Sequence, residues 1–226
     1  RWAAESVVSL AAGAAHELNN PLAVISGRAQ MLDASTADAG SRQALSVIRQ
    51  QAQAASDIVS QLMEIAEPPR PTPQAVDVVH LLIQLGQSLI DEGLLAESQI
   101  TIESQSDREV AYFDAAQLAL VLREILDNAI DVTDTDARRL TVKIARDVSE
   151  KNLVVQLADN GRGMTAEVMA RAMDPFFSHR QAGRKRGLGL ARVGQWLRQG
   201  GGSIRFESEP GKGTCVELRI PAMRSS

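Results

Sequence analysis

The sequence predicts an α+β fold, in which a helical hairpin is followed by an α/β sandwich domain. Through residues 1–67, apolar residues recur every three or four positions, which is the spacing of a core-facing stripe on a helix. Four prolines in residues 68–73 then end the second helix and favour an extended linker. Beyond residue 75, helix-like periodicity alternates with strand-like period-two patterns. These observations divide the chain into a helical domain at 1–67, a linker at 68–75 and an α/β domain at 76–226.

The helical domain is predicted as two helices separated by the polar, glycine-containing segment 33–41. Their apolar stripes include Leu18, Ile25 and Leu32 in the first helix and Ile48 in the second. An antiparallel hairpin buries only one stripe per helix and is too small to hold a core by itself. Pairing two copies into a four-helix bundle would bury the rest, so the sequence predicts a homodimer.

The α/β domain is predicted as one mixed sheet that is covered on one face by helices. Apolar periodicity favours helices at 76–95, 115–133 and 190–197. Period-two alternation of apolar and polar residues favours strands. These expected strands lie at 100–102, 109–112, 140–144, 153–157, 203–206 and 214–220.

The composition fits such a core and argues against several functional classes. Hydrophobic residues make up 44% of the 226 residues and aromatic residues only 3%, so the core must be mainly aliphatic. A net charge of -4 gives no reason to expect a nucleic-acid partner. The single cysteine, Cys215, excludes a disulfide framework and a cysteine metal cluster, and it is most simply a buried strand residue in a reducing compartment.

This segment is not expected to contact a membrane. It has no run of about 18 apolar residues, and its N-terminus lacks the pattern of a signal peptide. We therefore expect it in the cytoplasm, and a membrane tether elsewhere in the full-length protein is left open. The chain begins inside an apolar-periodic segment, which favours a fragment of a longer protein.

The first helix carries the motif His16-Glu17-Leu18-Asn19-Asn20-Pro21. His16 lies off the apolar stripe, and Asn20, four residues on, shares its face. A carboxylate such as Glu17 can draw a proton from an imidazole that attacks phosphorus, and an amide such as that of Asn20 can hold a water for the reverse, hydrolytic reaction. Pro21 is expected to bend the helix one turn after His16. The alternative reading of His16 is a plain surface histidine.

Glu124 and Asn128 share one face of the expected helix 115–133, in the motif Glu124-Ile125-Leu126-Asp127-Asn128-Ala129. An amide oxygen is a suitable ligand for Mg²⁺, which otherwise keeps waters and binds phosphate oxygens. The alternative is that both residues belong to the polar stripe of a surface helix.

Asp159 follows the expected strand 153–157 and opens the motif Asp159-Asn160-Gly161-Arg162-Gly163-Met164. If a nucleotide binds here, a fixed carboxylate can accept a hydrogen bond from the amino group of its adenine base. Gly161 and Gly163 permit positive φ and close approach of such a base. An ordinary Asn-Gly turn is the alternative explanation.

A strongly basic stretch, 178–186, lies between two further motifs, Asp174-Pro175-Phe176-Phe177 and Gly187-Leu188-Gly189-Leu190. The second motif opens a helix, where small residues let backbone N–H groups reach phosphate oxygens. Arg180, Lys185 and Arg186 could add side-chain contacts, because arginine binds phosphate bidentately. A solvated charge run is the alternative. His80 is expected to be structural, and the role of His179 on this stretch stays open.

These motifs, in this order and at these spacings, resemble the H, N, G1, F and G2 boxes of two-component sensor histidine kinases, from about Leu10 to Pro221. The first motif is most similar to that of the nitrogen-regulation type. The resemblance implies that His16 is the phosphoacceptor, that Glu17 assists the transfer and that Asn20 supports dephosphorylation of the partner protein. It also implies an ATP site in which Asn128 holds the Mg²⁺ that bridges the triphosphate.

In the same family, the stretch 178–186 would be a lid over the triphosphate, with Phe176 and Phe177 as its hydrophobic latch. The turn before the last strand, Gly211-Lys212-Gly213-Thr214, looks like the family's final glycine turn, although a plain hairpin turn explains it equally well. Thr214 is thereby placed among the residues expected at the ATP site.

The chain departs from the family pattern at three places. Glu124 stands where these kinases usually have asparagine. The related ATPases of the GHKL type, which share the nucleotide-binding fold, carry a glutamate there that orients the attacking water, and Glu124 can equally assist the metal. Lys185 and Arg186 replace a glycine and a small hydroxyl residue. Asp131 stands where a lysine or arginine is often found, so the cation that faces the phosphates is expected from the basic stretch instead.

The resemblance implies an enzyme that autophosphorylates His16 from Mg²⁺-ATP, passes the phosphoryl group to an aspartate of a response regulator and also dephosphorylates that regulator. Three alternatives stay open. Glu124 favours a GHKL-type ATPase or serine kinase, the altered Lys185-Arg186 pair favours a degenerate kinase that acts as a docking module, and Asn20 permits a net phosphatase. The sequence indicates neither the signal nor the regulator, nor whether transfer occurs within or between subunits.

Overall fold

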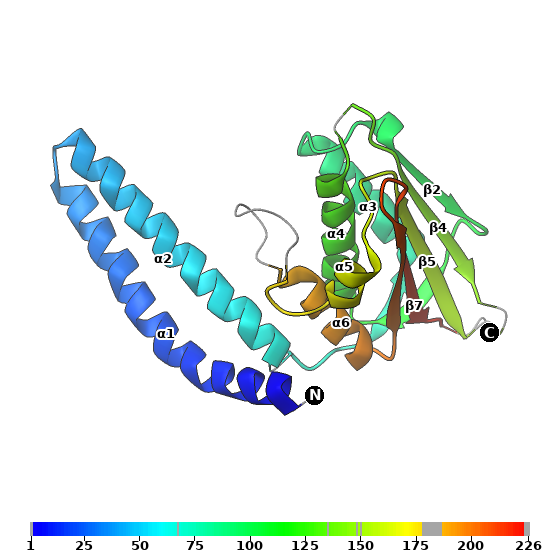
Figure 1. The fold of residues 1–226 in the computed structure, drawn as a ribbon, viewed down its shortest axis with the longest axis horizontal. Coiled ribbons are helices and arrows are strands. Elements are labelled where there is room, and N and C mark those ends of the chain that lie inside the picture. The colour runs from blue at the N-terminus through cyan, green and yellow to red at the C-terminus, as the bar shows by residue number, and fades with distance from the viewer. Residues whose placement is uncertain are drawn as a thin grey trace. The chain divides into compact units, whose positions relative to one another are not determined.

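The computed structural model describes residues 2–66, 68–134, 136–147, 149, 151–177 and 187–223, with side chains from Leu18 onward. The chain divides into two compact units, Arg1–Pro69 and Arg70–Ser226. The helices and strands of each unit are shown in Figure 1. No described helix combines the length and the apolar character needed to cross a membrane.

The first unit is a hairpin of two long helices, α1 (Trp2–Ser35) and α2 (Ala39–Ala66), which run antiparallel in Figure 1. The connection is shorter than expected, because α1 continues to Ser35. Asp38 caps the next helix, with its Oδ2 accepting a hydrogen bond from the backbone N–H of Ser41 at 2.7 Å. Hydrogen bonds from the side chain and from the backbone N–H of Ser41 lower the pKa of the Asp38 carboxyl.

Small residues form the buried seam of the hairpin, with Ala29 of α1 and Ala52 of α2 about 5% exposed. The larger residues of the predicted stripes are not covered by the single chain. Leu18, Ile25 and Leu32 are 50%, 46% and 57% exposed. The hairpin therefore leaves an apolar strip along α1, at seven-residue spacing.

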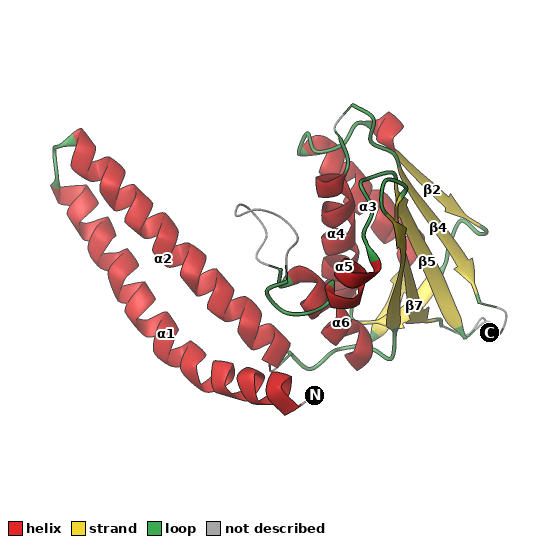
Figure 2. Cartoon of the chain, viewed as in Figure 1, coloured by secondary structure: helices red, strands yellow, loops and turns green. Residues whose placement is uncertain are grey.

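The second unit contains a five-stranded mixed sheet. The sequence predicts one mixed sheet for all the expected strands, but the strand expected at 109–112 lies in a separate two-stranded sheet. The strand order is β2-β4-β5-β7-β6, with β2 parallel to β4 and all other neighbours antiparallel. Helices lie on one face of the sheet (Figure 2). The strands are β2 (Ile100–Ser104), β4 (Leu140–Arg146), β5 (Asn152–Asp159), β6 (Ser203–Glu209) and β7 (Gly213–Pro221). The helices are α3 (Val78–Asp91), α4 (Ala115–Val132), α5 (Ala166–Arg171) and α6 (Gly189–Gln199).

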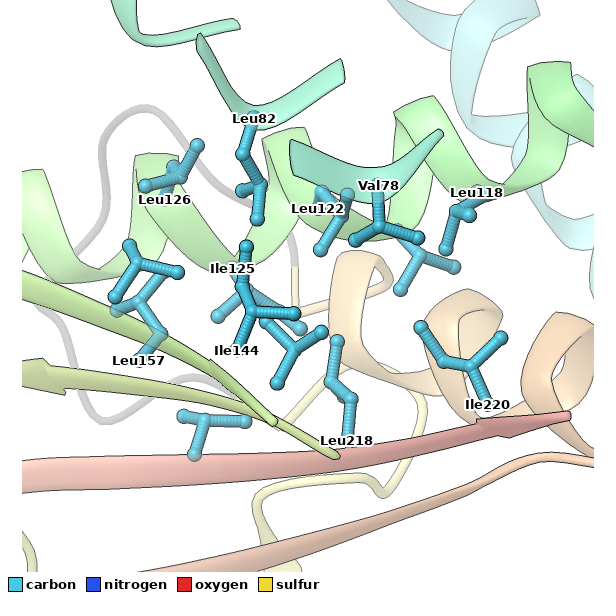
Figure 3. Packing of buried hydrophobic residues seen from close by; sticks show 14 of the residues in the cluster. Val78, Leu82, Leu118, Leu122, Ile125, Leu126, Ile144, Leu157, Leu218 and Ile220 are labelled. Carbon is cyan, nitrogen blue, oxygen red and sulfur yellow. The ribbon is translucent and has the colours of Figure 1, made fainter. Parts of the chain in front are cut away.

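The core lies between α4 and the sheet (Figure 3) and is aliphatic except for Phe113 and Trp196 among the described buried cluster. Strands β4 and β5 bury alternate residues, so one face of each packs inward. Residues of α4 and of the strands meet there, among them Leu122, Ile125, Leu126, Ile144, Leu157 and Leu218. Cys215, expected to be buried, lies on β7 and is partly exposed.

The first helix of this unit was predicted with the wrong bounds, and several short elements were not predicted. The helix expected from residue 76 begins at Val78, because Asp77 caps it by accepting a hydrogen bond from the N–H of His80 at 3.1 Å. The residues before it form β1 (Gln74–Asp77), which pairs with β3 (Val110–Phe113) in a separate two-stranded sheet. That helix also ends early, at Asp91, and a short 3₁₀ helix follows at Glu97–Gln99. The six-residue α5 was not predicted.

The segment expected as a linker, 68–75, is attached to the second unit through Thr72, near the C-terminal end of the segment. The backbone N–H and the hydroxyl of Thr72 donate to Oδ2 of Asp114 at 2.8 and 2.9 Å. Asp114 also caps α4 by accepting from the N–H of Gln117 at 3.0 Å. One carboxylate therefore holds both the end of the proline-rich stretch and the start of the helix that carries Asn128.

Candidate nucleotide-binding site and phosphoacceptor helix

Asp159 forms the fixed carboxylate of the candidate nucleotide site, at the end of β5. Its Oδ1 accepts hydrogen bonds from the backbone N–H groups of Gly161 at 2.8 Å and Thr214 at 3.3 Å. Burial raises the pKa of the Asp159 carboxyl, and these two backbone hydrogen bonds act in the opposite direction. The structure thus brings together Asp159, Gly161 and Thr214, three of the residues predicted for this site.

Gly161 and Gly163 allow two backbone segments to touch beside Asp159. A Cβ on Gly161 would lie 2.7 Å from the carbonyl oxygen of Val132 at the end of α4. Gly163 has φ +66°, and a Cβ there would lie 1.9 Å from the carbonyl oxygen of Glu209. Close backbone packing accounts for both glycines. It also fixes the loop after β5 against α4 and against the turn between β6 and β7.

Two residues that hold this loop were missed from the sequence. Ser208 accepts from the N–H of Met164 at 2.8 Å, and its hydroxyl lies 2.9 Å from that of Thr214. Asn160 accepts from the N–H of Arg139 at 2.8 Å and donates to the carbonyl of Ala137 at 2.7 Å. Asn160 stood in a recognised motif and could have been proposed, whereas an isolated serine on a strand gives no signal.

Glu124 and Asn128 lie one turn apart on α4, and both are partly exposed. Oε1 of Glu124 accepts from Nη2 of Arg192 on α6 at 2.6 Å. Arg192 was not among the residues that the sequence predicted for the site. Asp131, on the last turn of α4, is exposed.

The motifs on either side of 178–186 meet. The N–H of Phe176 donates to the carbonyl of Gly187 at 2.9 Å. Phe176 has φ +66° and is 55% exposed, and the guanidinium of Arg171 lies 4.4 Å from the ring centroid of Phe177. Leu188 is buried, and Gly189 and Leu190 form the first turn of α6. Arg180, Lys185 and Arg186 lie outside the described residues, as does His179.

His16 and Glu17 lie on α1, and their side chains lie outside the part that the structure describes. Asn20 follows one turn later and is exposed. Its neighbour Asn19 accepts from the hydroxyl of Ser56 on α2 at 2.9 Å, which fixes this part of α1 against α2. The helix is continuous through Pro21 and curves along its length in Figure 1.

Among the described residues, no group of three or more His, Cys, Asp or Glu side chains is arranged to hold a metal ion. A magnesium ion that is ligated mainly by phosphate oxygens and water needs no such cluster. The partly exposed amide of Asn128 is compatible with that kind of site.

Comparison with known proteins identifies both units. Residues 7–69 match the family model of the His Kinase A (phospho-acceptor) domain. Residues 113–224 match the model of the Histidine kinase-, DNA gyrase B-, and HSP90-like ATPase. The chain belongs to the two-component histidine kinases. Its second unit matches the ATP-binding domain of that family, and its hairpin matches the phosphoacceptor domain.

Similar histidine kinases occur in several bacteria. The sensor histidine kinase ZraS of Klebsiella oxytoca is 32% identical over 213 residues, covering 94% of this chain and 45% of ZraS. Sporulation kinase E of Bacillus subtilis is 28% identical, covering 97% of this chain and 29% of that kinase. The chain therefore spans less than half the length of these relatives.

Solved histidine kinase structures share the fold. Full-length ShkA, crystallised with AMPPNP, superimposes with a TM-score of 0.78 over 96% of this chain and 46% of ShkA, at 21% identity. Acinetobacter baumannii AdeS gives a TM-score of 0.61 over 92% of this chain and 98% of that chain, at 19% identity.

Proposed function

We propose that this chain is the core of a sensor histidine kinase that autophosphorylates His16 from Mg²⁺-ATP and passes the phosphoryl group to an aspartate of a response regulator. The observation that carries the proposal is that one chain holds both parts of the reaction. A histidine stands on the hairpin that matches the phosphoacceptor domain, and the ATP-binding unit holds Asp159 fixed at the end of β5.

The adenine of ATP is bound at Asp159. The carboxylate accepts a hydrogen bond from the adenine amino group, while the hydrogen bonds from Gly161 and Thr214 keep it in position. Because the loop is fixed before ATP arrives, little side-chain ordering is needed on binding. Gly163 supports the site indirectly, by letting this loop pack on the backbone of Glu209.

The phosphates are bound between α4 and the start of α6. The amide oxygen of Asn128 would ligate Mg²⁺, and the metal would neutralise charge on the triphosphate. Backbone N–H groups in Gly187, Leu188, Gly189 and Leu190 face the phosphates, helped by the dipole of α6. We further propose that Phe176 and Phe177 form a latch, that Asp131 lies at the border of the site and that Glu124 lies near the metal. Phosphate contacts are proposed for Arg180, Lys185 and Arg186.

His16 is the nucleophile. A ring nitrogen forms a bond to the γ-phosphorus, the bond from that phosphorus to the bridging oxygen breaks, and ADP leaves with the electron pair. The proton that the ring loses passes to Glu17. The aspartate of the regulator then takes the phosphoryl group from the histidine. In the reverse role as a phosphatase, the exposed amide of Asn20 holds the water that hydrolyses the regulator's acyl phosphate.

A homodimer is the proposed assembly. The apolar residues of α1 that the single chain leaves exposed, Leu18, Ile25 and Leu32, follow a seven-residue repeat. A second hairpin packed on this strip would bury them in a four-helix bundle. The proposal is supported further by the match to a phosphoacceptor domain.

The test is incubation with Mg²⁺ and ATP that carries a radioactive γ-phosphoryl group. The chain should acquire label that is lost in acid and kept in base, and His16→Ala and Asn128→Ala should both abolish it. His80→Ala is the matched control, because His80 is an exposed histidine on α3, and it should be labelled normally. Labelling that survives His16→Ala would show that another residue accepts the phosphoryl group.

A further inference from the structure

Glu124 and Arg192 form an ion pair that links α4 to α6. Nη2 of Arg192 lies 2.6 Å from Oε1 of Glu124, and the two side chains are only 12% and 22% exposed, respectively. Ion pairs at this distance and burial are stronger than those in open solvent, because water screens them less. The fold brings together two residues that are 68 positions apart.

Both partners have restricted positions. The carboxylate of Glu124 lies against the first turn of α6, where a Cβ on Gly189 would be 2.3 Å from Oε2. The dipole of that helix favours a negative charge at its N-terminal end. The guanidinium of Arg192 lies 5.2 Å from the ring centroid of Trp196, which is buried. The ion pair is therefore held from both sides.

We propose that Arg192 is a positioning residue that restrains Glu124 and prevents it from activating water, so that the γ-phosphoryl group is kept for His16. This inference rests on the proposed function, since it concerns the same ATP site. Glu124 stands four residues before Asn128 on one face of α4. An unrestrained carboxylate there would have access to the region of the triphosphate.

The suppressed reaction is hydrolysis of ATP. The oxygen of a water forms a bond to the γ-phosphorus, the bond to the bridging oxygen breaks, and ADP leaves with the electron pair. The proton lost by the water must be accepted by a base, which needs an available lone pair. In Glu124, Oε1 is engaged in a charge-assisted hydrogen bond with Arg192, and Oε2 faces the first turn of α6.

The net charge of the Glu124–Arg192 ion pair supports the same inference. Glu124 alone would place one more negative charge beside the triphosphate, and the positive charge of Arg192 cancels it. The ion pair thus has no net charge, like the asparagine amide that the family usually carries at this position. The replacement of asparagine by glutamate is compatible with kinase activity as long as Arg192 remains.

The test measures the ratio of inorganic phosphate released to phosphohistidine formed. Because it is a ratio, it does not depend on the fraction of active protein. Arg192→Gln should raise the ratio about a hundredfold or more, the lower range of what a general base contributes. Adding Glu124→Gln should reverse this increase. Arg192→Lys should give an intermediate ratio, since lysine keeps the charge without the planar fork. Arg198→Gln, which removes an exposed cation from the same helix, is the control.

An unchanged ratio in Arg192→Gln overturns the inference, as does an increase that persists after Glu124→Gln is added. If Arg192→Gln does not fold, Arg192→Lys decides, and a ratio equal to that of the unaltered chain overturns the inference. The proposed function fails differently, by the absence of phosphohistidine in the unaltered chain. In that case phosphate release in a His16→Ala background, with and without Arg192→Gln, still decides the role of Arg192.

Discussion

Replacing Asp159 with asparagine should weaken ATP binding without destabilising the fold. Oδ1 of the asparagine would keep the hydrogen bonds from Gly161 and Thr214. Its Nδ2 would then face the adenine amino group, a donor against a donor. A hydrogen bond to a charged group contributes about 1.5–3 kcal/mol, and about 1.4 kcal/mol is a factor of ten in affinity, so Kd should rise roughly ten- to hundredfold.

The thermal stability of Asp159→Asn should not fall along with its affinity for ATP. Burial raises the pKa of Asp159, so the folded state favours the protonated form more than the unfolded state does. A raised pKa adds stability at low pH, and this contribution is lost as the pH rises through the folded-state value. At neutral pH the ionised carboxylate costs stability, and the neutral asparagine removes that cost. The melting temperature should therefore stay the same or rise.

Titration with a fluorescent ATP analogue and thermal melting test both halves of this prediction. Affinity in the unaltered chain should also begin to fall at a pH above the ordinary carboxyl value of 3.8, as Asp159 becomes protonated. Asp147→Asn is the matched control at the opposite end of the β4–β5 pair. There the side-chain hydrogen bond from Asn152 lowers the pKa to about 2, so the variant should lose stability and bind ATP normally.

Two results would contradict this role of Asp159. One is an Asp159→Asn variant that binds ATP as well as the unaltered chain does, and the other is a loss of stability at neutral pH as large as that of Asp147→Asn. Either result would mean that Asp159 supports the loop after β5 rather than the nucleotide.

Gly163→Ala should lower the melting temperature more than Gly93→Ala, because both residues have positive φ but only Gly163 has backbone within contact distance of an added Cβ. Glu92→Gln should make the free energy of unfolding less sensitive to acid. Arg123 lowers the pKa of Glu92 from its ordinary value of 4.5 to about 2. The ionised carboxylate therefore stabilises the fold fully above pH 4.5, and this contribution is lost as the pH falls through about 2. Ile25→Asp should shift the chain from dimer to monomer in sedimentation, because it places a charge in the exposed strip of α1.

Much of this fold follows from local patterns. The helix that carries Asn128 was predicted at 115–133 and is found at Ala115–Val132, because its apolar residues recur at helical spacing over five turns. The five strands of the main sheet were predicted for a similar reason, since each alternates inward and outward residues. By contrast, β1 has only four residues and one buried side chain, Val76, which is too little for a periodic signal.

The site was predictable where residues close in sequence act together, and not where the fold joins distant ones. Asp159 and Gly161 stand in one motif, and the structure connects them by a hydrogen bond. The pairing of Glu124 with Arg192 depends on the packing of α4 against α6, which no local pattern encodes. The expected stripe of α1 was found exposed for a related reason, because its proposed cover is a second copy of the chain.

The most direct test of the central claim is the intact mass of the chain after incubation with Mg²⁺-ATP at alkaline pH, with the modified residue located by peptide fragmentation. We expect the addition of one phosphoryl group, located at His16 and removed by brief acid treatment. Phosphate release without any modified chain, or a phosphoryl group located on a serine or threonine, would contradict it.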